Sequence, residues 1–249
     1  MDLNALLKDY KQMVENRIEE LFPEADCSYN EVIKAARYSL LNGGKRIRPV
    51  IMMEFCKLCG GKPEDALDFA VALEMIHTYS LIHDDLPCMD NDDMRRGKPS
   101  CHKAFGEDIA LLSGDALLTE AFFVASNARV SAEKRLNAIS FLSTNAGVHG
   151  MIGGQVLDLS FEENKPDAAA LQDMYMRKTG ALLIAAASIG CISAGKYDQE
   201  TLKSAAKYGY NLGLAFQIVD DILDVTANEE VLGKPVGSDD KNNKTTFVS

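Results

Sequence analysis

The stretch DQETLKSAAKYGYNLGLAFQIVDDILDVT, residues 198–226, has the plainest structural pattern in the sequence. Its apolar and small residues recur in steps of three and four, which is the spacing of one face of an α-helix. They are Leu202, Ala205, Gly209, Leu212, Phe216, Val219 and Leu223. We therefore expect one long helix whose apolar face is buried against other helices.

Windows of the same periodicity follow one another along nearly the whole chain, and strand patterns are scarce. The spacing predicts helices at 2–21, 30–42, 49–59, 63–86, 107–128, 131–159, 167–178, 180–194 and 198–226. Two long loops, 87–106 and 227–249, are rich in charge and glycine, as functional loops often are. No repeat or linker divides the chain, so we predict an all-α, single-domain fold with an orthogonal or bundle-like helical core.

Composition and charge narrow the range of partners. The chain has 249 residues, 47% of them apolar, which is enough for a sizeable core. Its 37 acidic and 26 basic residues give a net charge of −11, which disfavours nucleic acid and anionic membranes as partners. The N-terminus lacks a signal-peptide pattern, and the longest nearly uncharged run, 180–195, is too short for a membrane span. We expect a cytoplasmic protein without a membrane span.

Six cysteines are present, and only Cys56 and Cys59 have a CxxC spacing. No second pair completes a zinc site, and the flanking pattern is helical rather than βαβ. Reduced thiols in the core are therefore favoured over a zinc site or a redox pair.

The first acidic cluster is HDDLPCMDNDDMRRGKP, residues 83–99. On a straight helix Asp84 and Asp90 would point about 240° apart and could not bind one ligand together. Pro87 should end the helix, so that the chain can turn Asp90 back toward Asp84. His77, seven residues before Asp84, shares its helical face.

The second acidic cluster is QIVDDILD, residues 217–224. Gln217, Asp220, Asp221 and Asp224 stand at i, i+3, i+4 and i+7, so we expect them to share a helical stripe distinct from the packed one. Three carboxylates on one stripe repel each other, and a bound hard divalent cation such as magnesium would relieve that repulsion. One such cluster alone is more simply a solvated acidic turn, but two clusters flanked by apolar helix favour metal binding.

A third element, GGKRIRP at 43–49, places a glycine turn and three cations at a helix start, where an anion is favoured. Further cations are scattered through this acidic protein at Arg95, Arg96, Lys178, Lys234 and Lys244. Together they would suit a multiply charged anionic ligand such as a diphosphate.

At these motifs the chain resembles the short-chain trans-prenyl diphosphate synthases, and most closely the bacterial farnesyl diphosphate synthases. The matching motifs are GGKRIRP at 43–49, the aspartate-rich motif at 84–90 with RRGKP at 95–99, GGQVLDL at 153–159, KTGAL at 178–182, the aspartate-rich motif at 220–224, and GKPVGSDDKNNKTTF at 233–247. The resemblance covers essentially the whole chain. It implies a helical bundle of the isoprenoid-synthase type with its active-site cavity between core helices.

The resemblance also implies roles for individual residues. About three Mg²⁺ ions per site, with Mn²⁺ able to substitute, would be held by carboxylates. These are Asp84, Asp85, Asp90, Asp220, Asp221 and Asp224. Allylic diphosphate would be bound by Arg95, Lys178, Gln217, Lys234 and Lys244, and isopentenyl diphosphate by Gly44, Lys45, Arg48, His77 and Arg96. The implied catalytic set is Asp84, Asp85, Asp90, Lys178, Thr179, Gln217 and Asp220.

The implied reaction is a head-to-tail condensation in which the allylic diphosphate ionises before isopentenyl diphosphate attacks. Tyr79 and Ser80 occupy positions that floor the hydrocarbon tunnel in this family, which favours the C15 product, although Tyr79 could be a simple core aromatic. Geranylgeranyl or geranyl diphosphate synthase is the alternative. The resemblance also implies a homodimer.

Two other functions stay open. A class I terpene cyclase would share the fold and the first motif, but the second DDILD at 220–224 argues against it. A non-catalytic partner subunit would normally lack one aspartate motif, and both are present. The family continues beyond the KNNKTTF segment with helices thought to close the site, whereas this sequence stops at Ser249, so we expect the domain to lack them.

Overall fold

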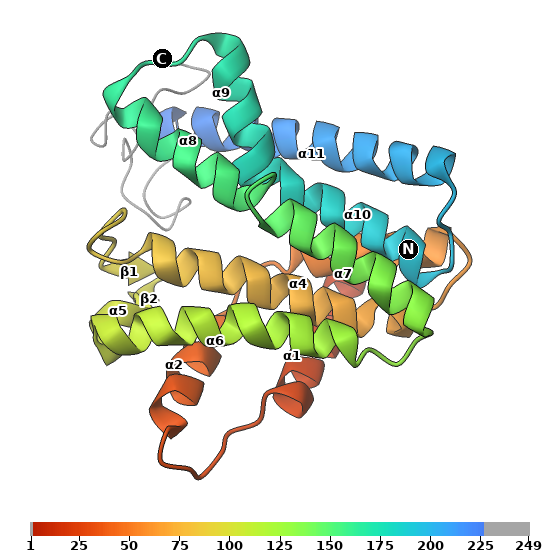
Figure 1. The fold of residues 1–249 in the computed structure, drawn as a ribbon, viewed down its shortest axis with the longest axis horizontal. Coiled ribbons are helices and arrows are strands. Elements are labelled where there is room, and N and C mark those ends of the chain that lie inside the picture. The colour runs from red at the N-terminus through yellow and green to blue at the C-terminus, as the bar shows by residue number, and fades with distance from the viewer. Residues whose placement is uncertain (1, 227–249) are drawn as a thin grey trace.

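A computed structural model of the chain describes residues 2–226, apart from the side chains of Glu163, Asp224 and Val225. These residues are mostly helical, and the prediction of an all-α fold is confirmed (Figure 1). The helices are α1 (Leu3–Leu21), α2 (Asn30–Leu40), α3 (Ile47–Leu58), α4 (Pro63–Asp84), α5 (Cys101–Phe105), α6 (Glu107–Ser126), α7 (Ala132–Ala146), α8 (Met151–Glu163), α9 (Ala168–Tyr175), η1 (Met176–Gly180), α10 (Ala181–Ser193) and α11 (Gln199–Thr226). Two short strands, β1 (Met94–Arg95) and β2 (Lys98–Pro99), form an antiparallel pair.

Helix α4 runs through the middle of the bundle, with α6 alongside it (Figure 1). Its residues are apolar around most of the circumference, and side chains such as Phe69, Leu73 and Ile76 are fully buried. A helix that is apolar all round must be surrounded by other elements, and α4 contacts α1, α3, α6 and α10. Helix α4, at whose end the first aspartate motif lies, is therefore held from several sides.

The predicted helix at 131–159 is wrong, because the chain turns between Ala146 and Met151. Gly150 lies so close to the Asn145 carbonyl that a Cβ atom there would collide with it. This tight turn separates α7 from α8. The predicted loop at 87–106 also contains more structure than expected, since it holds the β1–β2 pair and α5.

The predicted helices at 167–178 and 180–194 are joined rather than separated. Between α9 and α10 the helix widens for one π turn, η1, and then continues. Single π turns inside α-helices are frequent at functional sites. This one carries Lys178 and Thr179.

The buried face of α11 agrees with the predicted one in its first half and departs from it in the second. Ala205 and Gly209 are buried as predicted, whereas Phe216 and Val219 were expected in the core but are 45% and 52% exposed. The buried stripe continues instead through Gly213. Small residues there let the α11 backbone approach α10 and η1, with a Cβ at Gly209 falling 2.7 Å from Ile184 Cα. Close backbone packing, rather than the largest apolar side chains, sets the orientation of α11.

One described helix, α6, has the length and apolar composition of a membrane span, although only 39% of its apolar window is buried. It packs along α4 through Leu117 and Ala121, both fully buried. Its other side exposes Leu111, Leu112 and Phe123. A core helix with one uncovered apolar side has the same composition as a membrane span, so the composition does not distinguish the two.

The six cysteines are all free thiols, and Cys56 and Cys191 are buried between α3 and α10. Burial raises the pKa of both thiols to about 12, so they stay protonated at neutral pH. These two behave as the predicted core thiols, whereas Cys88 is exposed, contrary to that prediction.

Candidate active site

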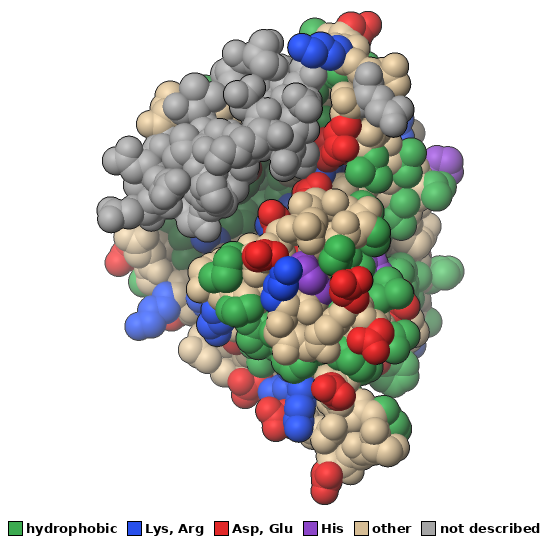
Figure 2. All heavy atoms as spheres, turned by 90° about the vertical axis from the view of Figure 1, so that its left-hand side faces the viewer, with side chains coloured by type: hydrophobic (Ala, Val, Ile, Leu, Met, Phe, Trp, Pro, Cys, Tyr) green, Lys and Arg blue, Asp and Glu red, His purple; other side chains and the backbone are tan. Residues whose placement is uncertain are grey.

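Two adjoining cavities lie between α3, α4, α8, η1 and α11. The first, about 440 Å³, is mainly apolar and is lined by Tyr79, Leu118, Met151 and Val156 among others. The second, about 480 Å³, is more polar and is lined by Lys45, Arg96, Gln217 and Asp220. Arg48, His77, Leu81 and Thr179 line both cavities, so the two share a wall. Figure 2 shows acidic and basic side chains close together on the end of the molecule that carries β1 and β2.

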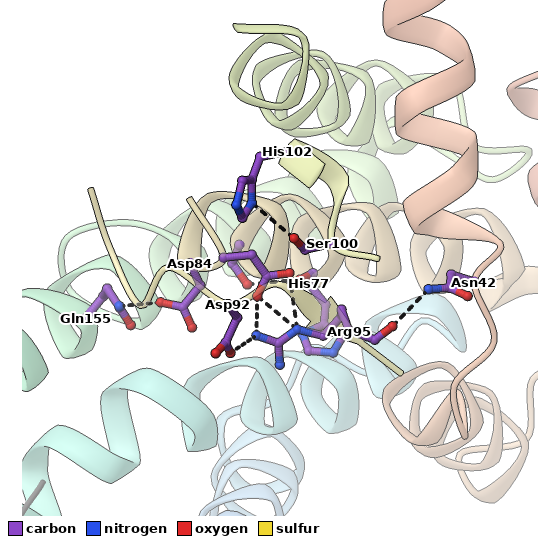
Figure 3. Close-up of polar contacts among 10 residues, drawn as sticks. Asn42, His77, Asp84, Asp92, Arg95, Ser100, His102 and Gln155 are labelled. Atoms are coloured by element: carbon purple, nitrogen blue, oxygen red, sulfur yellow. Dashed lines mark hydrogen bonds and ion pairs between the residues drawn. The ribbon is translucent and has the colours of Figure 1, made fainter. Parts of the chain in front are cut away.

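The first aspartate motif lies where α4 ends. The backbone N–H of Asp90 donates to the Asp84 carbonyl at 2.9 Å, so the chain turns back beside Asp84, as Pro87 predicts. Asp84 lines the apolar cavity. The Gln155 amide, on α8, donates to its carboxylate at 2.6 Å (Figure 3). Asp84 is thus aimed into the cavity by a neighbouring helix.

Asp85 faces away from the cavities and is only 2% exposed. The Arg95 guanidinium donates to both oxygens of its carboxylate and contacts Asp92 at 3.2 Å (Figure 3). Burial raises the pKa of Asp85 above its usual value, although Arg95 acts in the opposite direction. A bidentate arginine pair of this kind fixes both side chains.

The second aspartate motif divides in a similar way. Asp220 is exposed and lines the polar cavity. Asp221 is 1% exposed and accepts hydrogen bonds from the Tyr175 hydroxyl at 3.1 Å and the Gln217 amide at 3.2 Å. Gln217 and Asp221 therefore continue the packed stripe of α11, contrary to the prediction that all four polar residues avoid it. The side chain of Asp224 lies outside the described residues, as do Lys234 and Lys244.

The π turn η1 brings Lys178 and Thr179 to the cavities. Lys178 Nζ lies 2.5 Å from the Asp158 carboxylate of α8, and the Thr179 hydroxyl donates to Gln217 Oε1 at 3.2 Å. Two glycines flank the turn. A Cβ at Gly154 would collide with the Lys178 backbone, and one at Gly213 would fall 2.8 Å from Gly180 Cα. The turn is thus enclosed by α8 on one side and α11 on the other.

The basic wall of the polar cavity comes from the GGKRIRP segment and the loop after α4. Lys45, Arg48 and Arg96 line the cavity, and Arg96 donates to the Gly43 carbonyl at 2.8 Å. A Cβ at Gly44 would fall 2.9 Å from the Arg96 guanidinium, so glycine leaves room for it.

Arg46 and Glu74 also line this cavity, but the Arg46 side chain is buried and paired. Its left-handed backbone (φ 51°) turns the side chain inward, where it pairs with Glu74 at 2.6 Å. The pair leaves Arg48 as the inner cation of the wall.

His77 lies among these cations and borders both cavities. Burial, reinforced by Arg48, Arg96, Arg46 and Arg95, holds the pKa of His77 well below its usual value. The imidazole is therefore neutral at physiological pH and can donate one hydrogen bond to an anion without carrying charge.

Tyr79 and Ser80 line the apolar cavity on the α4 side. Tyr79 is 5% exposed, and within residues 2–226 its hydroxyl has no hydrogen-bond partner. Ser80 donates to the His77 carbonyl at 2.9 Å. The phenol ring is therefore a bulky wall of the cavity.

Among the described residues, no three His, Cys, Asp or Glu side chains converge closely enough to form a protein-only metal cage. Magnesium typically takes one or two carboxylates and completes its shell with water and substrate phosphate. Asp84 and Asp220, on the walls of adjoining cavities that are also lined by lysine and arginine side chains, fit that donor pattern. The residues suit a metal ion held jointly by protein and diphosphate.

Sequence reasoning missed three residues that orient the site: Gln155, Asp158 and Tyr175. The first two belong to GGQVLDL and stand at i and i+3, which places them on one face of α8. That spacing could have identified both residues from the sequence. Tyr175 gave none, because its contact with Asp221 depends on how α9 meets α11.

An all-α bundle with two acidic helix segments beside a basic cavity and an adjoining apolar cavity defines the helical isoprenoid-synthase class. Comparison with family models shows which family of this class is present. The chain belongs to the polyprenyl synthetase family, whose model matches residues 30–249.

Curated relatives include a farnesyl diphosphate synthase of Bacillus subtilis, 44% identical over 99% of this chain and 84% of its own length. Another is the chloroplastic geranylgeranyl pyrophosphate synthase 9 of Arabidopsis thaliana, 49% identical over 86% of this chain. The match spans only 61% of the length of the Arabidopsis relative.

Solved structures agree on the fold. The geranylgeranyl pyrophosphate synthetase of Pyrococcus horikoshii has a TM-score of 0.89 at 39% identity, covering 98% of this chain and 73% of that one. A geranyltransferase of Helicobacter pylori, solved with magnesium and isoprenyl diphosphate, has a TM-score of 0.84 at 36% identity, covering 98% and 82%.

Proposed function

We propose that this chain is a prenyltransferase that condenses isopentenyl diphosphate with dimethylallyl or geranyl diphosphate, giving farnesyl diphosphate and pyrophosphate. The observation that carries the proposal is the placement of Asp84 and Asp220 on the walls of two adjoining cavities, one apolar and one basic. An allylic diphosphate needs both environments, because its head is an anion and its tail a hydrocarbon. Relatives of similar sequence carry synthase names of this kind.

Asp84, Asp90 and Asp220 are the residues that would hold Mg²⁺, with Asp224 a further candidate. When bound, the ion supplies positive charge that stabilises pyrophosphate as it leaves. Asp85 and Asp221 were also predicted as ligands, but their carboxylates are buried against Arg95 and Tyr175. We assign these two to positioning: Asp85 orients Arg95, and Asp221 orients Gln217.

The chain's own groups would carry the rest of the ionisation step. Lys178, held by Asp158, and Arg95, held by Asp85, supply fixed cations for the allylic diphosphate, with Lys234 and Lys244 as further candidates. The oxygens of Thr179 and Gln217, 3.2 Å apart, provide a polar surface for the allylic cation. The apolar cavity excludes water that would otherwise capture that cation.

Isopentenyl diphosphate would bind at the basic wall. Lys45, Arg48 and Arg96 would contact its phosphates, with Gly44 giving room for Arg96 and neutral His77 donating a hydrogen bond. The site adjoins the apolar cavity, so that the double bond can reach the allylic carbon. We name no side-chain base for the final proton loss, and the released pyrophosphate is the proposed acceptor.

Product length is a separate part of the proposal. Tyr79 and Ser80 line the apolar cavity, and a buried phenol there supports a C15 limit. Geranylgeranyl or geranyl diphosphate is the alternative product, and relatives with geranylgeranyl names keep it open. Replacing Tyr79 with alanine should lengthen the product, and an unchanged product profile would retire this assignment.

We also propose that the chain acts as a cytoplasmic homodimer. The exposed apolar side of α6, with Leu111, Leu112 and Phe123 at 46%, 50% and 61% exposure, supports a protein contact there. Sedimentation of the purified chain tests the dimer, and cell fractionation tests the location.

The deciding experiment incubates the purified chain with dimethylallyl and isopentenyl diphosphates and separates the products by chromatography. The proposal requires linear prenyl diphosphates and consumption of isopentenyl diphosphate. A cyclic hydrocarbon made without isopentenyl diphosphate would instead indicate a terpene cyclase. No turnover alone, but altered products in a mixture with a related synthase, would indicate a partner subunit.

A further inference from the structure

His83 lies between the apolar cavity and helix α6. Its Nε2 atom is 3.0 Å from the backbone carbonyl of Leu111 and 3.9 Å from an Asp115 carboxylate oxygen. A carbonyl only accepts hydrogen bonds, so the contact requires the hydrogen on Nε2. The imidazole also borders the apolar cavity. It therefore ties the end of α4 to the α6 backbone at the cavity wall.

Gly114 makes this contact possible. A Cβ atom at Gly114 would overlap the His83 ring, meeting Nε2 and two ring carbons. Glycine is unfavourable inside a helix such as α6, so a packing reason is expected where it occurs. The absence of a side chain creates the notch that holds the imidazole.

The His83 ring also contacts Tyr79, one helical turn earlier. The two rings meet edge to face, with centroids 5.7 Å apart and planes at 74°. This geometry is a favoured aromatic contact. Within the described residues no hydrogen bond anchors the Tyr79 hydroxyl, so the phenol is fixed by packing, to which the His83 ring contributes.

We propose that His83, seated in the Gly114 notch, is a positioning residue for product length: it holds the Tyr79 ring across the cavity. The inference rests on the proposed function and extends it. Chain length then depends on the His83–Gly114 contact as well as on the size of residue 79.

Substitutions on the two sides of the His83–Gly114 contact should change product length in opposite directions. His83→Ala removes the support of Tyr79 and widens the cavity, which should raise the ratio of C20 to C15 product about two- to tenfold, as loss of one aromatic contact allows. Gly114→Ala pushes the imidazole off α6 toward the cavity, which should raise the share of C10 product. In the double variant the added methyl has no ring to displace, so its products should match those of His83→Ala.

The experiment measures product ratios of the purified 249-residue chain with both substrates and Mg²⁺, together with circular dichroism to establish folding. Ser113→Ala, next to Gly114 but directed at the Ala110 carbonyl, is the control and should leave the ratio unchanged. Tyr79→Ala runs in parallel.

If Tyr79→Ala lengthens the product while His83→Ala does not, the positioning role is overturned and the proposed function stands. If Tyr79→Ala also has no effect, the floor assignment fails and the inference fails with it. Should Gly114→Ala not fold, the His83→Ala ratio decides alone.

Discussion

The close approach of α11 to the π turn leads to a prediction in which effects on stability and on catalysis can be measured separately. Gly213 and Gly209 stand one turn apart on α11 and are similarly crowded: an added Cβ would lie 2.8 Å from Gly180 Cα at the first and 2.7 Å from Ile184 Cα at the second. Only Gly213 faces η1, which carries Lys178 and Thr179. Gly213→Ala and Gly209→Ala are therefore matched variants.

The expected magnitudes follow from these distances. A methyl group 2.8 Å from Gly180 Cα must be relieved by moving the π turn about 1 Å, a misplacement that can cost about 10²-fold in rate. Overpacking costs about 1–3 kcal/mol at either site, partly offset by the better helix propensity of alanine, about 1 kcal/mol. For a chain of this size, each kcal/mol lowers Tm by about 2–4 °C.

The assay measures kcat, KM and Tm for both variants and the parent chain. We expect similar Tm losses for the two variants, with kcat falling about 10²-fold for Gly213→Ala and less than about threefold for Gly209→Ala. Equal loss of kcat in both, or full kcat in Gly213→Ala with a lowered Tm, would refute a role for the π turn in placing catalytic groups.

Three further predictions concern charged groups. Asp84→Ala and Asp220→Ala should each lower turnover by about 10³-fold or more with the helical circular dichroism signal retained, because each removes a donor for the metal-bound diphosphate; near-normal rates would exclude these roles. Arg95→Leu should lower the unfolding free energy by about 3 kcal/mol in denaturant titrations, because it leaves Asp85 buried and unpaired, whereas the double variant with Asp85→Leu should recover much of that loss. The pKa of His77 is lower in the folded chain than in the unfolded chain, so protons bind the unfolded state preferentially. Stability should therefore fall as pH drops below the unfolded value of about 6.5, by at most about 1.4 kcal/mol per pH unit, and a His77→Gln variant that shows the same slope would contradict this.

Local chemistry made part of the fold predictable. Pro87 cannot continue a helix, and the turn that brings Asp90 back to Asp84 follows from that property alone. The break at 147–150 was missed because helical periodicity was followed across it as one helix, 131–159, whereas Gly150 packs against the Asn145 carbonyl in a turn.

The orientation of α11 was harder to predict from the sequence. Hydrophobic periodicity ranks Phe216 above Gly213, but the approach of α11 to η1 needs the smaller residue. The sequence also did not show that the two aspartates of each adjacent pair have different environments. Asp84 and Asp220 line cavities, while Asp85 and Asp221 are buried among hydrogen-bond donors. Such differences depend on contacts between distant segments, which one sequence does not record.

The most direct test of the account is a crystal structure of the chain with Mn²⁺ and a non-hydrolysable allylic diphosphate analogue. Anomalous density should place manganese between the analogue and the carboxylates of Asp84 on α4 and Asp220 on α11. Analogue bound without manganese between these two side chains, or carboxylates directed apart in the complex, would contradict the claim that the two helices grip one diphosphate through shared metal ions.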